Sequence, residues 1–425
     1  MFNIQVGTAI LLAVADGSKA EGVLADVSYV DSWAEGLFSR KAKLDWLAAG
    51  GETGTRPGAV SIDRADLEDM RPRPFQNGEW PSLVSCFAFV KSGVKTQNDP
   101  TLIKVNRADL LAGIIPLLAG RHDPAYQPQL ERQVAYRPFD RRWLYNDTKL
   151  VKRHGPELQA VWGDVNFALY GLPGGTGAGP AVWCHGLLPD YHAFRGSYGG
   201  YAFPLRDNRA GHGPFNVSPA LLAGLAASYG APVSAEDAFD AMLTLLSASS
   251  YTLRFAEDLE DVFPHVPFPG DHGMFVAAAE LGRKIRAVES FVRAPGSKYL
   301  KPALARVETE ATATLHATDM ADGEFFLCAN QSGRVSGISA EIWSFAVSGY
   351  RLLPRWLAAR EGLAVDHALI TAMRDVAGRI AELIDLFGEA DTLLDQVLGG
   401  TLTRDALGLG MALGLGEKET VTGDE

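Results

Sequence analysis

The sequence predicts a mixed α+β protein, with strands near its N-terminus and a helical C-terminal part. Residues 2–14 alternate and then run apolar, and residues 23–30 alternate again after an Asp16-Gly17 turn. This pattern is typical of a β-hairpin. Residues 369–387 instead repeat apolar side chains every three to four positions, which indicates an amphipathic helix. With 47% hydrophobic and 21% charged residues over 425 positions, the chain can build more than one buried core.

Between these ends, apolar spacing and turn-forming residues predict further elements. Ser234, followed three residues later by Asp237, is a typical N-cap and predicts a helix that begins beside it. Residues 171–219 combine many Gly and Pro residues with aromatic ones, which predicts a loop-rich region too aromatic to be a disordered linker. The other expected elements, in chain order, are a short helix and a polar loop within 38–75, strands within 82–90 and 101–105, helices over 108–120, 251–262 and 273–293, and strands over 307–318 and 325–329.

Targeting and redox signals favour a cytoplasmic protein. No apolar run reaches the ~18 residues that a membrane-spanning helix needs, and no basic segment with an apolar stretch and a cleavage site opens the chain. Cys86, Cys184 and Cys328 are odd in number and far apart. This usage indicates buried thiols in a reducing compartment.

The charge distribution is uneven. The chain carries a net charge of −12, which by itself disfavours a nucleic-acid partner. Two segments nevertheless have a local net charge of +5, residues 132–154 and residues 282–301. Local charge decides whether a phosphate-binding face exists, so each basic island predicts either a phosphate contact or a solvated helix face.

Motifs for cofactor binding and catalysis are incomplete. Gly174–Gly179 is glycine-rich, but no Lys-Ser/Thr pair follows it, so a flexible loop is expected. Asp123–Tyr126 superficially matches the turn that grips an adenine amino group, but it lacks the second proline. No nucleophile elbow occurs. We therefore predict no catalytic residue in this chain.

Metal-binding patterns are also incomplete. Pro189-Asp190 could open a metal-dependent nuclease motif, but residues 191–230 contain neither Glu nor Lys. The best remaining donors lack the paired spacing of a metal site, so we predict none; these donors are Cys184, His185, His192 and His212.

Binding chemistry is better represented. Residues 137–153 (RPFDRRWLYNDTKLVKR) interleave arginine and lysine with aromatic groups, and these cations hold phosphates and can read guanine. Loops within 191–215 have the arginine-rich, aromatic composition of recognition loops, although a small-molecule pocket is the competing interpretation. The predicted DNA-contacting residues are Arg137, Arg141, Arg142, Lys149, Lys152, Arg153, Arg195, Arg206, Arg209, Tyr251 and Arg254.

Several segments also resemble a known family. They are, in order, FNIQVGTAILLAV at the start, Gly93-Val94-Lys95-Thr96 with Asp99, Tyr136-Arg137-Pro138-Phe139-Asp140-x-Arg142 with Tyr145, Phe263-Pro264-His265-Val266-Pro267, and Glu341-Ile342-Trp343 with Gly349-Tyr350 and Trp356-Leu357. Their order and content resemble the C-terminal region of type ISP restriction–modification enzymes and related adenine-specific DNA methyltransferases. The segment from Tyr136 to Arg142, with Tyr145, is the most specific match.

The resemblance implies a target-recognition domain that reads a short sequence in double-stranded DNA. It implies that methyl transfer occurs on a methyltransferase domain or subunit, where S-adenosylmethionine would bind, so we expect no cofactor and no catalysis in this chain alone. It also divides the chain: residues 1–45 resemble the terminal strands of a methyltransferase fold, 46–300 form an α/β recognition domain, 301–412 form a strand pair with a helical subdomain, and 413–425 form a disordered tail.

The chain departs from the family pattern around one of its tyrosines. Ser247–Ser250 replace a His-Ser-Pro segment before Tyr251, Thr252 replaces the usual arginine, and Glu260 and Asp261 replace a lysine. A second hypothesis therefore stays open. The chain is then a protein-interaction module, or a remnant of a phage-defence system, that no longer reads DNA.

Overall fold

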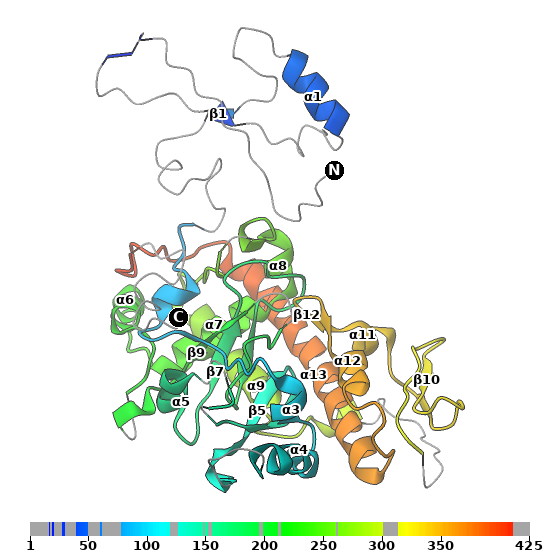
Figure 1. Cartoon of the computed structure of the whole chain (residues 1–425). Coiled ribbons are helices and arrows are strands. Elements are labelled where there is room, and N and C mark those ends of the chain that lie inside the picture. The colour runs from blue at the N-terminus through cyan, green and yellow to red at the C-terminus, as the bar shows by residue number, and fades with distance from the viewer. Residues whose placement is uncertain are drawn as a thin grey trace. The chain divides into compact units, whose positions relative to one another are not determined.

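The computed structural model in Figure 1 divides the chain into two units, Met1–Phe75 and Gln76–Glu425. Each unit is described by itself. The structure describes residues 17, 19–20, 28–29, 40–49, 60–61, 78–119, 126–147, 149–151, 155–194, 199–210, 214–260, 262–300 and 313–410.

The first unit contains short elements. Strand β1 (Ser28–Tyr29) pairs antiparallel with β2 (Val60–Ser61), and helix α1 (Arg40–Ala49) lies between them in sequence. Helix α1 confirms the helix predicted within 38–75. The predicted strand over 2–14 lies outside the described residues, so the hairpin at the start of the chain stays a prediction.

A four-stranded antiparallel sheet forms the centre of the second unit. Strand β7 (Ala168–Gly171) lies between β8 (Val182–His185) and β9 (Tyr201–Pro204), and β3 (Lys91–Ser92) extends the sheet beyond β9. Every residue of β7 and β8 is buried. Strands covered on both faces have no alternating pattern, so the glycine-rich 171–219 region shows no clear strand signal although β8 and β9 lie within it.

A three-stranded sheet lies beside a second, smaller core. Strand β6 (Asp140–Tyr145) is its central strand, between β5 (Glu131–Arg137) and β4 (Ile103–Lys104). Helix α4 (Arg107–Ala119) packs on this sheet through Leu110, Ile114 and Leu118, which recur every four residues on one helix face. The hairpin β5–β6 positions three of the predicted DNA-contacting residues, Arg137, Arg141 and Arg142.

Three long helices form the main core with the central sheet. Helices α7 (Ala235–Ser247) and α9 (His272–Glu289) pack on each other and on β8, and α13 (His367–Val397) packs on both helices. Their N-caps satisfy otherwise unpaired amide groups: Ser234, Asp271 and Asp366 each accept a backbone N–H from inside the helix. The Ser234 cap confirms the sequence prediction.

The remaining elements connect or cover these layers. Figure 1 shows α13 running alongside α11 and α12. The other helices are α3 (Asp99–Leu102), α5 (Pro156–Trp162), α6 (Pro219–Tyr229), α8 (Ser249–Arg254), α10 (Ser297–Leu300), α11 (Ala340–Ser344) and α12 (Leu352–Ala358); the paired strands are β10 (Glu324–Phe326) with β11 (Arg334–Ser336) and β12 (Ala346–Val347) with β13 (Tyr350–Arg351); the 3-10 turns are η1 (Leu83–Cys86), η2 (Pro128–Leu130), η3 (Asn208–Ala210) and η4 (Asp258–Glu260).

The mixed α+β class is confirmed, and two local predictions are wrong. The apolar run at 82–90 forms η1 instead of a strand, because all four residues of η1 are buried in the core and only single bridges flank them. The predicted helix over 251–262 is shorter, since α8 ends at Arg254 and only the 3-10 turn η4 follows. The predicted tail at 413–425 lies outside the described residues.

Candidate nucleic-acid interface

The tip of the β5–β6 hairpin, residues 136–142, is anchored in the main core. Phe139 has a positive φ of 59° and is 4% exposed. Its ring packs edge-on against Trp183, with centroids 5.1 Å apart, and against Phe291 at 5.5 Å. A positive φ at a bulky residue is uncommon and persists only where packing holds it. The phenylalanine of the Tyr-Arg-Pro-Phe-Asp motif therefore fixes the hairpin tip to the scaffold.

Asp140 binds two arginines, Arg142 of the same strand and Arg360 from a distant part of the chain. Its Oδ2 accepts hydrogen bonds from Nε and Nη2 of Arg142, at 2.9 and 2.6 Å, and its Oδ1 accepts one from Nη2 of Arg360 at 2.9 Å. Arg360 also donates to the backbone carbonyl of Trp356 in helix α12. Because Asp140 and Arg360 are both buried, this cluster ties the hairpin tip to the C-terminal helices.

Arg137 is bound to Asp190 in a similar way. Its Nη1 lies 2.9 Å from Oδ1 of Asp190, and both side chains are mostly buried. The guanidinium groups of Arg137 and Arg142 both lie over the ring of Tyr136, 4.1 and 3.9 Å from its centroid. Burial raises the pKa of Tyr136 to about 12 and that of Asp190 to about 6. Two of the predicted DNA-contacting arginines are thus engaged within the protein.

Arg141 differs from its two neighbours because its hydrogen-bond donors are available. The side chain is exposed and lies over Phe291, with the guanidinium carbon 4.0 Å from the ring centroid. It makes no hydrogen bond or ion pair within the described parts of the chain. Arg379 lies over the same ring, also at 4.0 Å, but is bound to Asp375. The hairpin tip therefore presents one stacked cation to solvent.

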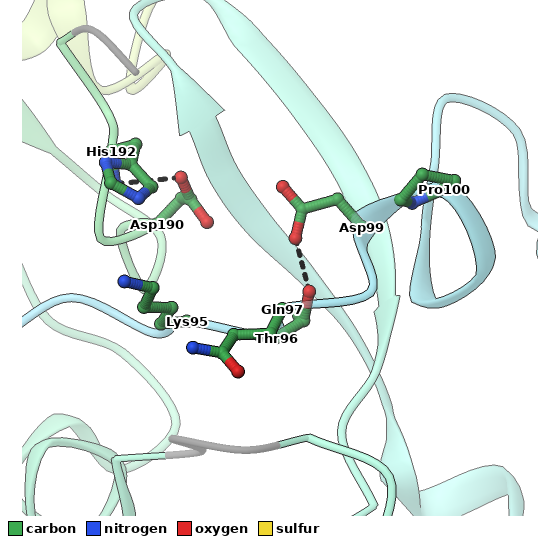
Figure 2. A pocket seen from close by; sticks show the side chains of 7 residues that line it. All are labelled: Lys95, Thr96, Gln97, Asp99, Pro100, Asp190 and His192. Carbon is green, nitrogen blue, oxygen red and sulfur yellow. Dashed lines mark hydrogen bonds between the residues drawn. The ribbon is translucent and has the colours of Figure 1, made fainter. Parts of the chain in front are cut away.

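A pocket of about 300 Å³ lies beside the hairpin. Its walls come from the 95–99 loop and from the segment that begins at Asp190. Backbone hydrogen bonds join the two segments, from Val94 to Pro189 at 3.0 Å and from Tyr191 to Val94 at 2.7 Å. Gly93 permits this approach, since a Cβ there would lie 2.6 Å from the backbone of Asp190. Figure 2 shows the lining residues Lys95, Thr96, Gln97, Asp99, Pro100, Asp190 and His192.

Asp99 connects the pocket to the hairpin. Its carboxylate accepts a short hydrogen bond from the Thr96 hydroxyl and one of 2.9 Å from the Tyr136 hydroxyl. The backbone N–H of Asn98 donates to the Thr96 hydroxyl, and Gln97 adopts a positive φ of 58°. These contacts join two of the sequence motifs in one cluster. Sequence reasoning missed the pocket, although both motifs and Pro189-Asp190 had drawn attention separately.

Two further predicted residues lie on the loop that follows β9. Arg206 is 40% exposed, lies 3.5 Å from Glu236 and lies over the ring of Phe215. Arg209 is 52% exposed and makes hydrogen bonds of 2.5 to 3.1 Å to Asp207. Exposed ion pairs of this kind contribute little stability. Both guanidinium groups can therefore exchange these carboxylates for phosphates at small cost.

The rest of the predicted set is dispersed. Tyr251 is fully buried, and its hydroxyl donates to the His265 carbonyl at 2.7 Å, so it offers no surface to a ligand. Arg254, the last residue of helix α8, pairs with Asp395 of α13, and Figure 1 shows α8 well apart from β5. Lys149 is exposed after β6. Lys152, Arg153 and Arg195 lie outside the described residues.

The second basic island is engaged in ion pairs between helices. Arg286 lies 2.7 Å from the fully buried Asp240, and Arg293 lies 2.6 Å from Glu382. Arg283 contacts Asp237 at 2.8 Å. These pairs join α9 and the segment after it to α7 and α13. The basic island at 282–301 therefore supports helix packing.

The described residues show neither a metal-binding cluster nor a helix suited to a membrane. Among them, no group of three or more His, Cys, Asp or Glu side chains is arranged to hold a metal ion. Cys184 and His185 are buried in β8, and burial lowers the pKa of His185 to about 3. None of the helices in the described part of the chain is both long and apolar enough to cross a membrane.

This mixed α+β scaffold, with its arginine-bearing hairpin and polar pocket, has the character of a recognition domain. The family described as Type ISP C-terminal specificity domain matches residues 71–385, so the chain belongs to that family. The resemblance found in the sequence is therefore confirmed. No curated protein matches the chain.

Solved structures with a similar fold include three chains determined in complexes with DNA or a DNA substrate mimic. A nuclease-deletion mutant of the Type ISP restriction-modification enzyme LlaGI, in complex with a DNA substrate mimic, has a TM-score of 0.59 and 14% identity, covering 81% of this chain and 31% of its own. The ATP-dependent Type ISP restriction-modification enzyme LlaBIII bound to DNA has a TM-score of 0.60 and 15% identity, and the match covers 88% of this chain and 28% of that one. A DrdV–DNA complex has a TM-score of 0.62 and 16% identity, and the match covers 85% of this chain and 42% of that one. The chain thus spans between 28% and 42% of the length of these three chains.

Proposed function

We propose that this chain recognises a short sequence in double-stranded DNA, as the specificity module of a Type ISP-like restriction–modification enzyme. Membership of the specificity-domain family supports the proposal. So do three structural neighbours that are themselves DNA complexes. The observation that carries it in this chain is the exposed, unpaired Arg141, held by stacking at the end of an anchored hairpin.

The contacts divide into two groups. Arg137 and Arg142 hold the hairpin in place through Asp190 and Asp140, and Arg141 meets the duplex. Of the other predicted cations, the exposed Lys149, Arg206 and Arg209 supply further phosphate contacts. We propose the same role for Lys152, Arg153 and Arg195. Phosphate contacts of this kind set register and orientation, while base contacts set specificity.

Methyl transfer belongs to another domain or subunit in this proposal. S-adenosylmethionine binds there, and the target adenine is rotated out of the duplex into that active site, because its amino nitrogen is unreachable inside a stacked helix. Residues 1–45 complete or dock on the methyltransferase sheet, and residues 46–300 carry recognition. A pull-down between this chain and such a methyltransferase tests this division.

Salt-dependent binding tests the proposal directly. The full chain should bind duplex DNA at ~50 mM salt, with an affinity that falls steeply as salt rises because phosphate contacts release counterions. Arg141→Ala should lower the affinity. It should also reduce the slope of log affinity against log salt concentration by about one, the change expected for one lost phosphate contact. Lys284→Ala, at an exposed cation on α9, is the matched control and should leave both quantities unchanged. Equal binding by the Arg141 variant and the parent chain removes Arg141 from the interface.

A protein-interaction module is the second candidate function. The net charge of −12 and the internal pairing of Arg137 and Arg142 favour it. In that case the chain shows no binding to duplex DNA at ~50 mM salt, where phosphate contacts are strong.

A further inference from the structure

The pocket beside the hairpin is richer in hydrogen-bond acceptors than a phosphate site. Asp190 is 4% exposed, and its Oδ1 accepts from Arg137 and from the backbone N–H of His192. Its Oδ2 makes no hydrogen bond within the part of the chain that the structure describes. Figure 2 shows the carboxylates of Asp99 and Asp190 directed toward one another across the pocket. A carboxylate oxygen of a mostly buried residue thus faces a space that a ligand can enter.

This arrangement selects the chemistry of the ligand. A phosphate placed here would meet two carboxylates, and like charges at short range in a partly buried site repel strongly. An amino group, by contrast, donates hydrogen bonds to carboxylates. In the major groove of DNA the amino groups are N6 of adenine and N4 of cytosine, and Asp side chains accept from the latter. Gln97, exposed at the rim, has the side chain that reads adenine through two hydrogen bonds.

The pocket is also rigid before any ligand arrives. The Thr96 hydroxyl and the Tyr136 hydroxyl both donate to Asp99, and the Gly93 backbone packs directly on Asp190. Lys95 is held with its ammonium 4.8 Å from the centroid of the Tyr191 ring. Preorganised side chains lose little conformational entropy on binding, which favours specific readout. Through Tyr136 the pocket belongs to the same cluster as the hairpin tip.

We propose that this pocket binds the exocyclic amino group of an adenine or cytosine in the target duplex, with Asp99 and Asp190 as the acceptors. Asp99 is then a specificity-determining residue, and Gln97 contacts the same base or its neighbour. The inference rests on the proposed function, because it assumes that the chain reads duplex DNA. It adds a contact to a base, whereas the hairpin cations are proposed to contact mainly phosphates.

Base analogues test the inference once a preferred duplex has been selected from a random pool with the full chain. At each specified adenine or cytosine, the base is replaced by purine or by 2-pyrimidinone, which lack the amino group. At one position this deletion should weaken binding roughly 5- to 100-fold, the range for a good base contact. An adenine position and a cytosine position are distinguished by which analogue has the effect.

Asp99→Asn completes a double-mutant cycle with the analogue. The variant should bind the intact duplex more weakly, and removal of the amino group should then cause a smaller further loss than in the parent chain, because Asp190 still accepts from the amino group. Lys95→Met serves as the matched control at the rim: it removes a charge without removing an acceptor, so the analogue should still weaken its binding by the full factor. Circular dichroism and thermal unfolding establish that each variant is folded.

A crosslink gives a measurement that does not depend on Asp99. The three cysteines of the chain are all buried, so Gln97→Cys introduces an accessible thiol at the rim. A duplex whose tether, on the amino nitrogen of the analogue-sensitive base, ends in a mixed disulfide with a small thiol should crosslink to this variant, because the introduced thiolate displaces the small thiol by disulfide exchange. Val165→Cys, at a side chain that is 74% exposed but does not line the pocket, should not react.

The outcomes separate the two proposals. If the chain selects no sequence and binds no duplex, the proposed function and this inference both fail. If it selects a sequence but no amino deletion is coupled to Asp99→Asn, and no crosslink forms at residue 97, only the inference fails. A reduced salt slope for Lys95→Met without any base coupling means that the pocket contacts phosphate, which also overturns it.

Discussion

Two segments with the same local charge differ in how their cations are paired. The basic islands at 132–154 and 282–301 each carry a net charge of +5. In the second island, Arg283, Arg286 and Arg293 meet carboxylates on neighbouring helices. In the first, Arg137 and Arg142 are also paired, but Arg141 between them is exposed and stacks on Phe291. The comparison teaches that local sequence charge does not decide which cations are available to a ligand, because the tertiary structure pairs some of them with carboxylates and leaves others at the surface.

The largest expected effect is on the second island. Arg286→Ala leaves Asp240, which is 0% exposed, without its main partner, because Arg283 reaches it only at 4.0 Å. Removal of one member of a buried ion pair costs about 3–5 kcal/mol of unfolding free energy. Urea unfolding measures this loss, and Lys284→Ala on the same helix should change stability by less than about 0.5 kcal/mol. A loss of unfolding free energy as small as that of the control would mean that the Arg286–Asp240 ion pair does not stabilise the fold.

The pH dependence of stability tests the buried pair of the first island. Burial raises the pKa of Asp190 to about 6 from its ordinary value of 3.8. The folded state therefore binds this proton more tightly than the unfolded state, so the stabilisation is present below about pH 4 and is lost as pH rises to about 6. The difference amounts to about 2–3 kcal/mol at 1.36 kcal/mol for each pKa unit.

Asp190→Asn isolates this contribution, because asparagine does not titrate. The unfolding free energy of the parent chain minus that of the variant should fall between pH 4 and pH 6 and then level off. A difference that is flat over this window would show that Asp190 keeps an ordinary pKa, and that its pairing with Arg137 outweighs its burial.

A smaller effect separates the paired and exposed arginines of the hairpin tip. Arg142→Ala removes two hydrogen bonds to Asp140, which keeps its bond to Arg360, so the loss should be about 1–3 kcal/mol. Arg141→Ala, one residue earlier, removes only a stacked, exposed side chain and should cost less than about 1 kcal/mol. Thermal unfolding of the two variants side by side measures the difference; equal losses would place both arginines in the same structural role.

Helices with a clear local signal could be predicted well from the sequence. The helices at 108–120, around 235–247, 273–293 and 369–387 have apolar residues at helical spacing, and Ser234 supplies the cap of one of them, so local interactions largely determine them. The run at 82–90 was predicted wrongly as a strand. Its apolar composition indicates that the segment is buried. Burial alone does not distinguish a strand from a 3-10 turn that is buried in a core.

The sequence by itself determined the mixed α+β class, the long helices and, through ordered motifs, the specificity-domain family. Only the tertiary structure decided which cations are available and where a ligand can enter. Asp99 and Asp190 are 91 positions apart and meet in one pocket, and Asp140 and Arg360 are 220 positions apart and form one ion pair. The reason is physical: periodicity and capping act over a few residues, whereas the partner of a charge is chosen by chain segments that come together only when the protein folds.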